Sequence, residues 1–296
     1  FDSFPLESHL NHFLHDHINA EINSTVIESK QDCLDWLTWT YMYRRLLQNP
    51  NYYDLQGKTK EHLNDYLSEL VEKTLSDLQK SNCINISTSD SSNENLVPLN
   101  YGKIASFYYV KYNTIDLFSQ SLSESTKKIS DLINILCSAY EFEEVSIRNG
   151  EDDILFSLAK NCGMDELIKK QNFFNEPHCK ANILLNCYFS RQPIPSDMLS
   201  DQKQIIEIAY RLSSAFVDIL STNGILKQSI LSMELSQMII QAMWLKNSTL
   251  LQLPHFDIEI VENCKKNDVN EISDFMNLED NERNEIVKFN NKQLNE

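Results

Sequence analysis

The sequence predicts a mostly α-helical protein: a winged helix with a small β-wing, followed by a helical bundle and a helix-loop-helix segment. Apolar residues recur at three- and four-residue spacings through most of the 296 residues, as on the buried face of a helix. Glycine occurs only five times, which disfavours folds that place glycine turns beside phosphates. Only one short stretch alternates apolar and polar residues in the manner of a strand. The length allows two or three compact units.

The first predicted unit is the winged helix, over residues 1–112. Its first helices are expected at residues 6–20, 30–47 and 60–81. Pro50 ends the second helix, because a proline disfavours helical angles at the residue before it. The alternating run 83–86 and the run 96–99 are predicted as the two strands of the wing. Asn100 is expected to cap a closing helix that carries Phe107 on its apolar side.

The second predicted unit, residues 113–251, is a bundle of antiparallel helices, because short polar loops separate its helical patterns. These helices are expected at residues 123–139, 152–160, 180–189, 203–221 and 227–244. Residues 252–296 are predicted as a helix-loop-helix domain. Its helices are expected at residues 257–266, 271–276 and 280–289.

Charge and motifs argue against catalysis by this chain. The formal net charge is −17 and no long segment is basic, so long-range repulsion disfavours tight binding to a phosphate backbone. The strings G-x-x-x-x-G-K-[ST], G-x-S-x-G and H-E-x-x-H, which mark nucleotide, hydrolase and zinc sites, do not occur in the sequence. We therefore expect no catalytic residues, no cofactor and no enzyme activity of these 296 residues themselves.

The cysteines and histidines form no recognisable metal motif. The seven cysteines include no C-x-x-C pair, a usage typical of a soluble protein in a reducing intracellular compartment. One predicted helix carries four histidines: His9, His12, His15 and His17. Because three residues turn a helix about 60° short of a full turn, such rings splay apart. Polar histidines on a helix face are favoured over a metal site.

Three carboxylates close together raise the alternative of acid–base chemistry. They are Glu141, Glu143 and Glu144. Since neither a nucleophile nor a basic partner accompanies them in the sequence, a solvated helix end is the favoured interpretation.

Four longer strings carry a resemblance to a known family. They are DWLTWTYMYRRLLQNPNYYDLQG, NYGKIASFYYVKYNTIDLFS, AFVDILSTNG and MELSQMIIQAMWLKNSTLLQLPHF. Together they resemble the C-terminal region of the Brr2 family of spliceosomal superfamily-two RNA helicases, in the second of its two cassettes. The resemblance covers essentially the whole chain, and the abrupt apolar start of the sequence suggests a piece of a longer protein.

The resemblance implies that a winged helix and a Sec63 homology unit follow a helicase motor. It implies a nuclear protein that takes part in splicing by unwinding paired U4 and U6 RNA, with the first cassette performing the unwinding. For the present chain it implies a non-catalytic scaffold and protein-interaction platform. The expected partners are the motor domains of the same chain and spliceosomal proteins, with no membrane partner, and the expected state is a monomer.

An aromatic-basic cluster in the first unit is the candidate docking surface. It consists of Tyr41, Tyr43, Arg44, Arg45, Tyr52 and Tyr53. Successive helical positions lie about 100° apart, so the two arginines cannot both face one partner. One of them is expected to pair with carboxylates of the adjoining motor. Tyrosines give apolar area with a polar tip, as in packed interfaces, so docking is favoured over the alternative of RNA contact.

The predicted helix 203–221 has one apolar and one polar side. The apolar side carries Ile205, Ile208, Ala209, Leu212, Phe216 and Ile219. By resemblance this is a ratchet-like helix whose polar side lines a channel for single-stranded nucleic acid. Stacking and cationic groups serve sequence-tolerant strand binding, which makes Tyr210, Arg211 and Ser214 the candidates. Glu207 and Asp218 oppose phosphate, so any grip on RNA is expected to be weak. The alternative is an ordinary solvated helix face.

Overall fold

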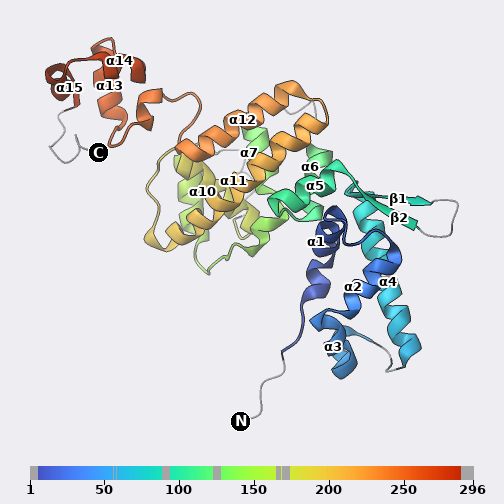
Figure 1. The fold of residues 1–296 in the computed structure, drawn as a ribbon. Helices are drawn as coiled ribbons and strands as arrows, with labels where there is room; N and C mark the ends of the chain where they lie inside the picture. Colours follow the sequence, from blue (N-terminus) through green and yellow to red (C-terminus); the bar gives the residue numbers. More distant parts are fainter. Residues whose placement is uncertain are drawn as a thin grey trace. The chain divides into compact units, whose positions relative to one another are not determined.

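A computed structural model shows the fold (Figure 1). It describes residues 6–55, 57, 59–88, 94–122, 128–164, 168 and 174–287. Helices dominate and the two strands form one small sheet, which confirms the predicted fold class. Among the described residues, no helix has the length and apolarity needed to cross a membrane. The chain divides into two compact units, one of residues 1–146 and 207–233 and the other of residues 147–206 and 234–296.

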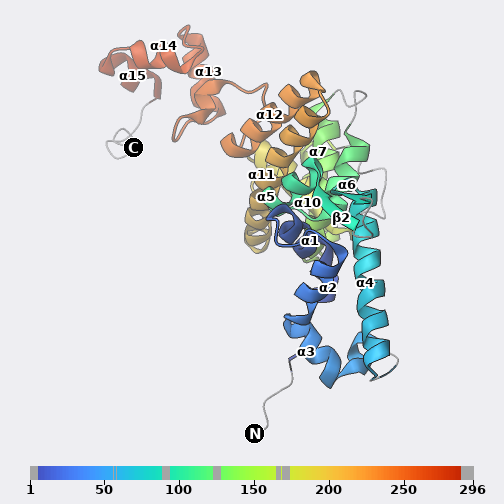
Figure 2. The same ribbon diagram turned by 45° about the vertical axis from the view of Figure 1, so that its right-hand side comes forward.

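The first unit begins with helices and a β-wing in the predicted order. These elements are α1 (Leu10–Asn23), α2 (Lys30–Thr38), α3 (Tyr41–Gln48), the 3-10 turn η1 (Pro50–Tyr53), α4 (Lys60–Lys80), β1 (Ile84–Thr88), β2 (Glu94–Pro98) and α5 (Asn100–Tyr108). The strands pair antiparallel with Ile86 opposite Leu96, and β2 lies at the upper end of α4 in Figure 2. The amide of Leu96 also donates to the carbonyl of Glu28, 2.8 Å away, so the wing is tied to the start of α2.

The predicted single helix over residues 30–47 is wrong, because the chain breaks it between α2 and α3. Ser29 and Asp32 form a capping box that starts α2. Thr40 is extended at φ −79° and ψ 158°, and its hydroxyl accepts from the amide of Tyr43. This second N-cap starts α3 as a separate helix. Pro50 stands at the start of η1, as a helix-ending proline does.

The closing helix α5 packs on α1 at a glycine. The amides of Asn19 and Asn23 both donate to the carbonyl of Gly102 at 2.9 Å. A Cβ at Gly102 would stand 2.2 Å from the carbonyl oxygen of Cys83, so this approach requires glycine. The predicted cap at Asn100 is wrong: the extended residue at the boundary is Leu99, which makes no side-chain cap.

The rest of the first unit supplies the bundle helices. They are α6 (Tyr112–Ser121), α7 (Ile129–Cys137), the 3-10 turn η2 (Tyr140–Glu144), and the parts of α11 (Leu199–Thr222) and α12 (Leu226–Gln241) that fall within residues 207–233. Phe118 of α6 meets Phe216 of α11 edge to face, with ring centroids 4.3 Å apart. Helix α6 is not among the helices predicted from the sequence, and the first residues of the helix expected at 123–139 lie outside the described residues.

Glu141 corrects another expectation, because it is buried rather than solvated. Its carboxylate accepts from the amide of Lys111 at 2.8 Å and from the hydroxyl of Thr114 at 2.7 Å. These donors belong to the start of α6, where the first amides of a helix have no intrahelical partner. Glu141 therefore caps α6 from a distant part of the chain. Glu143 and Glu144 are exposed.

The second unit is built around a helix that is buried along most of its length. Its remaining elements are α8 (Asp152–Asn161), α10 (Pro177–Phe189), the 3-10 turns η4 (Ser196–Met198) and η5 (Thr249–Gln252), α13 (Ile258–Lys266), α14 (Ile272–Asn277) and α15 (Asp280–Val287). Every residue of α10 from Cys179 to Cys187 is buried. Just beyond its end, Arg191 donates to the carbonyls of Ala242 at 3.1 Å and Leu251 at 2.7 Å.

The three C-terminal helices occur as predicted, although positions 288 and 289 of the last one lie outside the described residues. Their core continues back to the end of the bundle. It contains Met243, Leu250, Leu251, Phe256, Val261, Cys264, Val269 and Val287. The predicted domain boundaries at residues 112 and 251 stay a prediction.

Candidate interaction surfaces

The aromatic-basic cluster of α3 and η1 converges on Glu7. Arg45 donates to this carboxylate from Nε at 3.1 Å and from Nη2 at 2.6 Å. The amide of Asn49 adds a bond of 2.9 Å, and the hydroxyl of Tyr53 one of 3.1 Å. The Tyr53 hydroxyl accepts in turn from the amide of Ser8 at 2.8 Å. The segment before α1 is thus fastened to α3 and η1.

The charge-assisted bonds at Glu7 perturb the ionisation of the cluster. Hydrogen bonds from Arg45, and then from Asn49, lower the pKa of Glu7 to about 2. Burial raises the pKa of the Tyr53 phenol, and the neighbouring carboxylate raises it further. No sequence pattern marks Glu7 as the partner of Arg45, because residues 38 positions apart show no shared periodicity. Since Arg45 is paired within its own chain, Arg44, which is exposed, is the arginine open to a partner.

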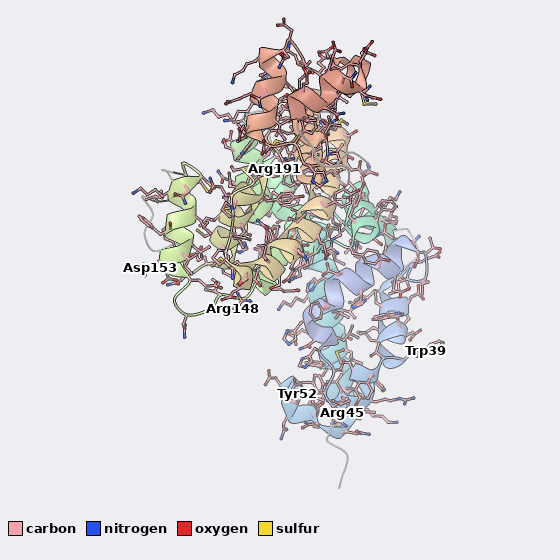
Figure 3. All side chains as sticks on the ribbon, turned by 90° about the vertical axis from the view of Figure 1, so that its left-hand side faces the viewer. Trp39, Arg45, Tyr52, Arg148, Asp153 and Arg191 are labelled. Atoms are coloured by element: carbon pink, nitrogen blue, oxygen red, sulfur yellow. The ribbon has the colours of Figure 1, made fainter. Side chains whose placement is uncertain are left out.

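The other members of the cluster divide between core and surface. Tyr43 packs against the core of the first unit. Tyr41 and Tyr52 keep about half of their surface exposed, and the Tyr41 hydroxyl donates to the carbonyl of Leu6 at 2.9 Å. Trp39, which the sequence pattern does not single out, is 89% exposed at the end of α2. Figure 3 shows it away from Tyr52 and Arg45, so Trp39 and Tyr52 do not lie on one face.

Large exposed aromatic side chains are unusual on a folded domain. Tryptophan is mostly buried in folded proteins, and apolar groups that stay exposed are typical of interaction sites when they cluster. Here Trp39 follows α2 and Tyr41 begins α3 only two positions later. The turn between α2 and α3 is therefore the strongest candidate docking site of this unit.

Helix α11 has the two sides that the sequence predicts. Ile205, Ala209, Leu212, Phe216 and Ile219 are fully buried, and Ile208 is half-buried. On the other side Tyr210 is 51% exposed, and the Ser214 hydroxyl donates back to the Tyr210 carbonyl at 3.3 Å. Arg211 is half-buried, and its Nε is buried without an acceptor among the described residues. This leaves a donor that an anionic ligand could satisfy.

A hydrogen bond joins the end of α5 to the polar side of α11. The Tyr108 hydroxyl donates to Asp218 Oδ2 at 2.8 Å. Burial and the Asp218 carboxylate raise the pKa of Tyr108 to about 12. On either side of Tyr108, Phe107 is 75% and Tyr109 82% exposed. Phe107, expected on the apolar side of the closing helix, is therefore exposed, and the ring of Tyr109 is exposed as well.

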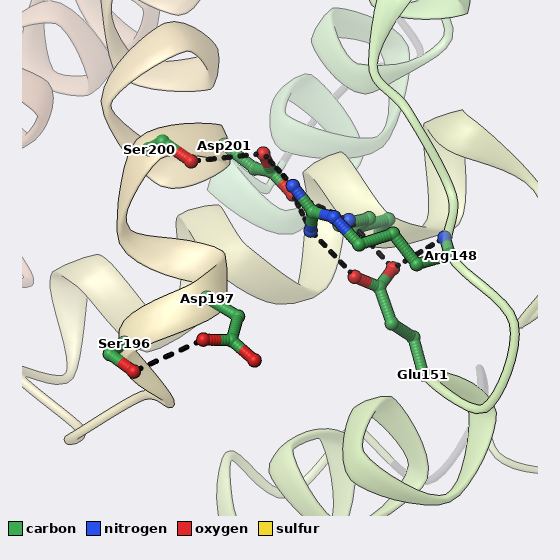
Figure 4. A network of polar contacts seen from close by, with 7 residues as sticks. Arg148, Glu151, Ser196, Asp197, Ser200 and Asp201 are labelled. Atoms are coloured by element: carbon green, nitrogen blue, oxygen red, sulfur yellow. Dashed lines mark hydrogen bonds and ion pairs between the residues drawn. The ribbon is translucent and has the colours of Figure 1, made fainter.

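A network of four charged side chains joins α8, α10 and α11 in the second unit (Figure 4). Lys180 is fully buried, and its Nζ donates to Glu151 and Asp201 at 2.7 Å each. Arg148 donates to Glu151 at 2.8 Å and to Asp201 at 2.7 and 3.0 Å. Two cations and two carboxylates balance within the network, with Arg148 at its partly exposed edge.

The network has the character of a structural joint. Burial raises the pKa of Glu151 and Asp201, but hydrogen bonds from Lys180 and Arg148 outweigh it, so both pKa values are lowered. The same carboxylates raise the pKa of Arg148. The two carboxylates and Arg148 are held ionised at neutral pH, which suits a fixed ion cluster rather than proton transfer. No local sequence pattern predicts this network, because its members stand in three separate parts of the chain.

The histidines of α1 and the residue before it are spread over different contacts. His15 stacks on Tyr112 with ring centroids 4.5 Å apart and lies 3.4 Å from Asp77. His9 faces His12 at 6.1 Å, and His17 is exposed. Within the described ranges, no three histidine, cysteine or acidic side chains lie close enough together to hold a metal ion.

Two family models match the chain. The Sec63 Brl domain matches residues 98–291, and the Winged Helix-turn-helix domain matches residues 7–88. The second match ends within the wing, and the first begins at the end of β2. Together they cover most of both compact units.

Several curated relatives are similar to the chain over its whole length. The U5 small nuclear ribonucleoprotein 200 kDa helicase of Homo sapiens is 47% identical over 294 residues, which is 99% of this chain and 13% of the relative. The protein of the same name in Drosophila melanogaster is 46% identical over 298 residues. The DExH-box ATP-dependent RNA helicase DExH12 of Arabidopsis thaliana is 47% identical over 301 residues. The chain thus spans about an eighth of the length of these relatives.

Proposed function

The chain belongs to the Sec63 Brl domain family, with a winged helix before that domain, and we propose that it is the non-catalytic region after the motor of a spliceosomal RNA helicase. In this role it braces the motor domains of the same polypeptide and recruits splicing proteins. The parent protein is then a nuclear, ATP-dependent enzyme that unwinds paired RNA during pre-mRNA splicing. The chain itself acts as a monomeric scaffold of three domains: residues 1–112, 113–251 and 252–296.

The observation that carries this proposal is the exposed aromatic turn between α2 and α3. Trp39 and Tyr41 expose large apolar area. They lie in a predicted winged helix, residues 1–112, in which acidic residues outnumber basic ones. Aromatic residues and arginine are enriched at protein interfaces, and Arg44 stands in the same segment. By contrast, the sequence holds no phosphate-binding loop. These features support protein contact over catalysis.

A reconstitution experiment tests the docking role. The chain of 296 residues is titrated in trans against the helicase motor of its parent protein, and association is measured by calorimetry. We expect Trp39→Ala or Arg44→Ala to weaken association at least tenfold, since central aromatic and arginine contacts contribute about 2 kcal/mol or more. Lys73→Ala, on the exposed side of α4, is the matched control. Unchanged association in both variants rejects this surface.

Catalysis is tested on the chain alone. We expect no phosphate release from ATP above the level of a buffer blank, with or without RNA. Turnover that scales with protein concentration and co-elutes with the monomer would contradict the proposal.

The second candidate function is weak, direct binding of single-stranded RNA on α11. It is favoured by one specific observation: Arg211 has a buried donor that meets no acceptor in the part of the chain that the structure describes, next to the exposed ring of Tyr210. A phosphate could accept a hydrogen bond from Arg211 while a base stacks on the ring of Tyr210. Ser214 lies one turn further on. Asp218 is already engaged by Tyr108, but Glu207 is exposed and repels phosphate.

Fluorescence anisotropy with a labelled 12-nucleotide RNA distinguishes the two functions. We expect the isolated chain to bind at best weakly at low salt. If α11 is a genuine site, the dissociation constant is micromolar, and the slope of log K against log salt is about −0.7 for each phosphate contacted. Arg211→Ala then weakens binding, whereas Lys203→Ala, exposed two turns earlier, serves as the control. Equal binding by both variants rejects the α11 site.

A further inference from the structure

Two cysteines of the second unit lie in contact although no disulfide joins them. The sulfurs of Cys162 and Cys187 are 3.6 Å apart, and both are free thiols. Cys162 directly follows α8, and Cys187 belongs to the buried helix α10. Among the seven cysteines Cys162 is the one that is not fully buried. The pair therefore combines one thiol that solvent can reach with one that it cannot.

The surroundings make the two thiols chemically different. Side-chain hydrogen bonds with Cys187 and then with Ser190 favour the thiolate of Cys162, so the pKa of Cys162 is lowered to about 7 despite partial burial. The same contact, together with burial, raises the pKa of Cys187. Burial raises the pKa of Cys33 and Cys179 to about 12. At neutral pH Cys162 is thus the thiol with a large thiolate fraction.

Trp244 fixes the direction of the Ser190 hydroxyl. Its indole Nε1 donates to Ser190 Oγ at 2.9 Å. Because Oγ accepts from the indole, its own hydrogen is free to point at the Cys162 sulfur. The dipole at the end of α8 works against a thiolate at Cys162, so the Cys187 and Ser190 donors supply the stabilisation. A packed ring thereby holds one of the two donors in place.

We propose that Cys162 and Cys187 are a peroxide-oxidised thiol pair, in which Cys162 attacks and Cys187 resolves. The Cys162 thiolate attacks one oxygen of a hydroperoxide, forming a sulfur–oxygen bond as the oxygen–oxygen bond breaks and the leaving oxygen takes up a proton. The Cys187 sulfur then attacks the sulfenic sulfur of Cys162. A disulfide forms, and hydroxide leaves with the thiol proton as water. Two thiols are oxidised while one peroxide is reduced.

The geometry requires only a small movement. A disulfide has its sulfurs about 2.05 Å apart, so the two atoms must approach by roughly 1.5 Å. Cys162 stands just past the last turn of α8, where a side-chain rotation meets less packing than within a helix. The product would lock the end of α8 to α10. This inference is independent of the proposed function.

The test treats the 296-residue chain with hydrogen peroxide at pH 7 and maps the cysteines by mass spectrometry without reduction. We expect a peptide pair joined through Cys162 and Cys187, with a loss of two hydrogens. We also expect Cys162 to be alkylated by iodoacetamide at least roughly tenfold faster than Cys179, because the thiolate is the reactive form. Alkylation of Cys162 no faster than Cys179, or disulfides that omit the pair, overturns the proposal.

Variants separate the two roles. In Cys187→Ala we expect a sulfenic acid on Cys162 that a 1,3-dione probe traps. In Cys162→Ala we expect peroxide to leave Cys187 unmodified. Ser190→Ala should slow alkylation of Cys162 at pH 7 but not at pH 10. The substitution removes a hydrogen bond that stabilises the thiolate, but it leaves the access of the reagent to Cys162 unchanged. Identical pH profiles for Ser190→Ala and the unmodified chain would remove Ser190 from the mechanism. The wild-type mapping stands by itself if a variant fails to fold.

Discussion

The guanidinium of Arg45 holds the carboxylate of Glu7 through two hydrogen bonds, from Nε at 3.1 Å and from Nη2 at 2.6 Å. A planar, bidentate pair of this kind specifies geometry as well as charge. It joins the segment before α1 to α3, and Asn49 and Tyr53 complete the shell around the carboxylate. The arginine within the docking cluster thus fixes the shape of the surface, and its neighbour Arg44 is left to face outward.

Acid should release this N-terminal segment only at very low pH. The pKa of Glu7 is lowered from about 4.5 to about 2 in the folded chain, so the stabilisation is complete above pH 4.5 and disappears as the pH falls through 2. The backbone amide of Ser8 donates to the Tyr53 hydroxyl, which in turn donates to Glu7, so this amide senses the protonation of Glu7. We expect its NMR shift to change with a midpoint near pH 2. Glu7→Gln should show the acid-form shift already at pH 7, and a wild-type midpoint near 4.5 would contradict the assignment.

Removing the buried ammonium of the ionic network should destabilise the second unit strongly. Lys180→Met leaves Glu151 and Asp201 buried beside a single cation, and breaking a buried pair in this way costs about 3–5 kcal/mol. Urea unfolding measures the free energy. Lys203→Met, at an exposed position of α11, is the control and should change it by less than about 0.5 kcal/mol. Equal effects of the two substitutions would show that the network is not structural.

Gly102→Ala should destabilise the winged helix. The added Cβ would stand 2.2 Å from the Cys83 carbonyl oxygen and 2.7 Å from Asn19 Oδ1, so α5 must move away from α1. Overpacking of this kind costs about 1–3 kcal/mol. Thermal unfolding followed by circular dichroism detects the change. In Gly150→Ala the new Cβ meets nothing within 4 Å at φ 88°, so only left-handed strain of about 1 kcal/mol is expected. A smaller loss at Gly102 than at Gly150 would contradict the close approach.

The contact between Tyr108 and Asp218 should weaken in alkali. The pKa of Tyr108 is raised to about 12, so its stabilisation is present below pH 10 and lost as the pH rises through 12. Absorbance at 295 nm follows phenolate formation. Tyr108→Phe should remove this late-titrating group and about 1 kcal/mol of stability, whereas Tyr109→Phe, on an exposed ring, should do neither. A titration curve that Tyr108→Phe leaves unchanged would refute the shift.

Periodicity predicts most of the helical architecture, because apolar stripes depend only on local spacing. The stripe Leu63, Leu67, Val71 and Leu75 predicts α4, and the structure buries all four residues. The break between α2 and α3 escapes that reasoning. Thr40 separates the two helices through one hydrogen bond between its side chain and the backbone. The spacing of apolar residues continues through this position. Local capping here overrides a continuous hydrophobic pattern.

The contacts that shape the candidate sites could not be derived from local patterns. Glu7 and Arg45, Glu141 and Thr114, and Lys180 and Asp201 are each far apart in sequence. An exposed charge and a buried partner look alike in a single sequence, since only the fold decides which carboxylate meets which donor. Trp39 illustrates the converse: its residue type predicts burial, and the structure leaves it in solvent.

Helix α10 has implications for how this protein can vary over evolutionary time. Every residue of the helix from Cys179 to Cys187 is buried. A neutral substitution is therefore not expected at any of these positions. Substitutions that survive must match their neighbours in volume, or arise together with compensating changes in adjacent helices. Directed libraries aimed at this protein should therefore leave α10 untouched and diversify the outward positions of α4 and α12.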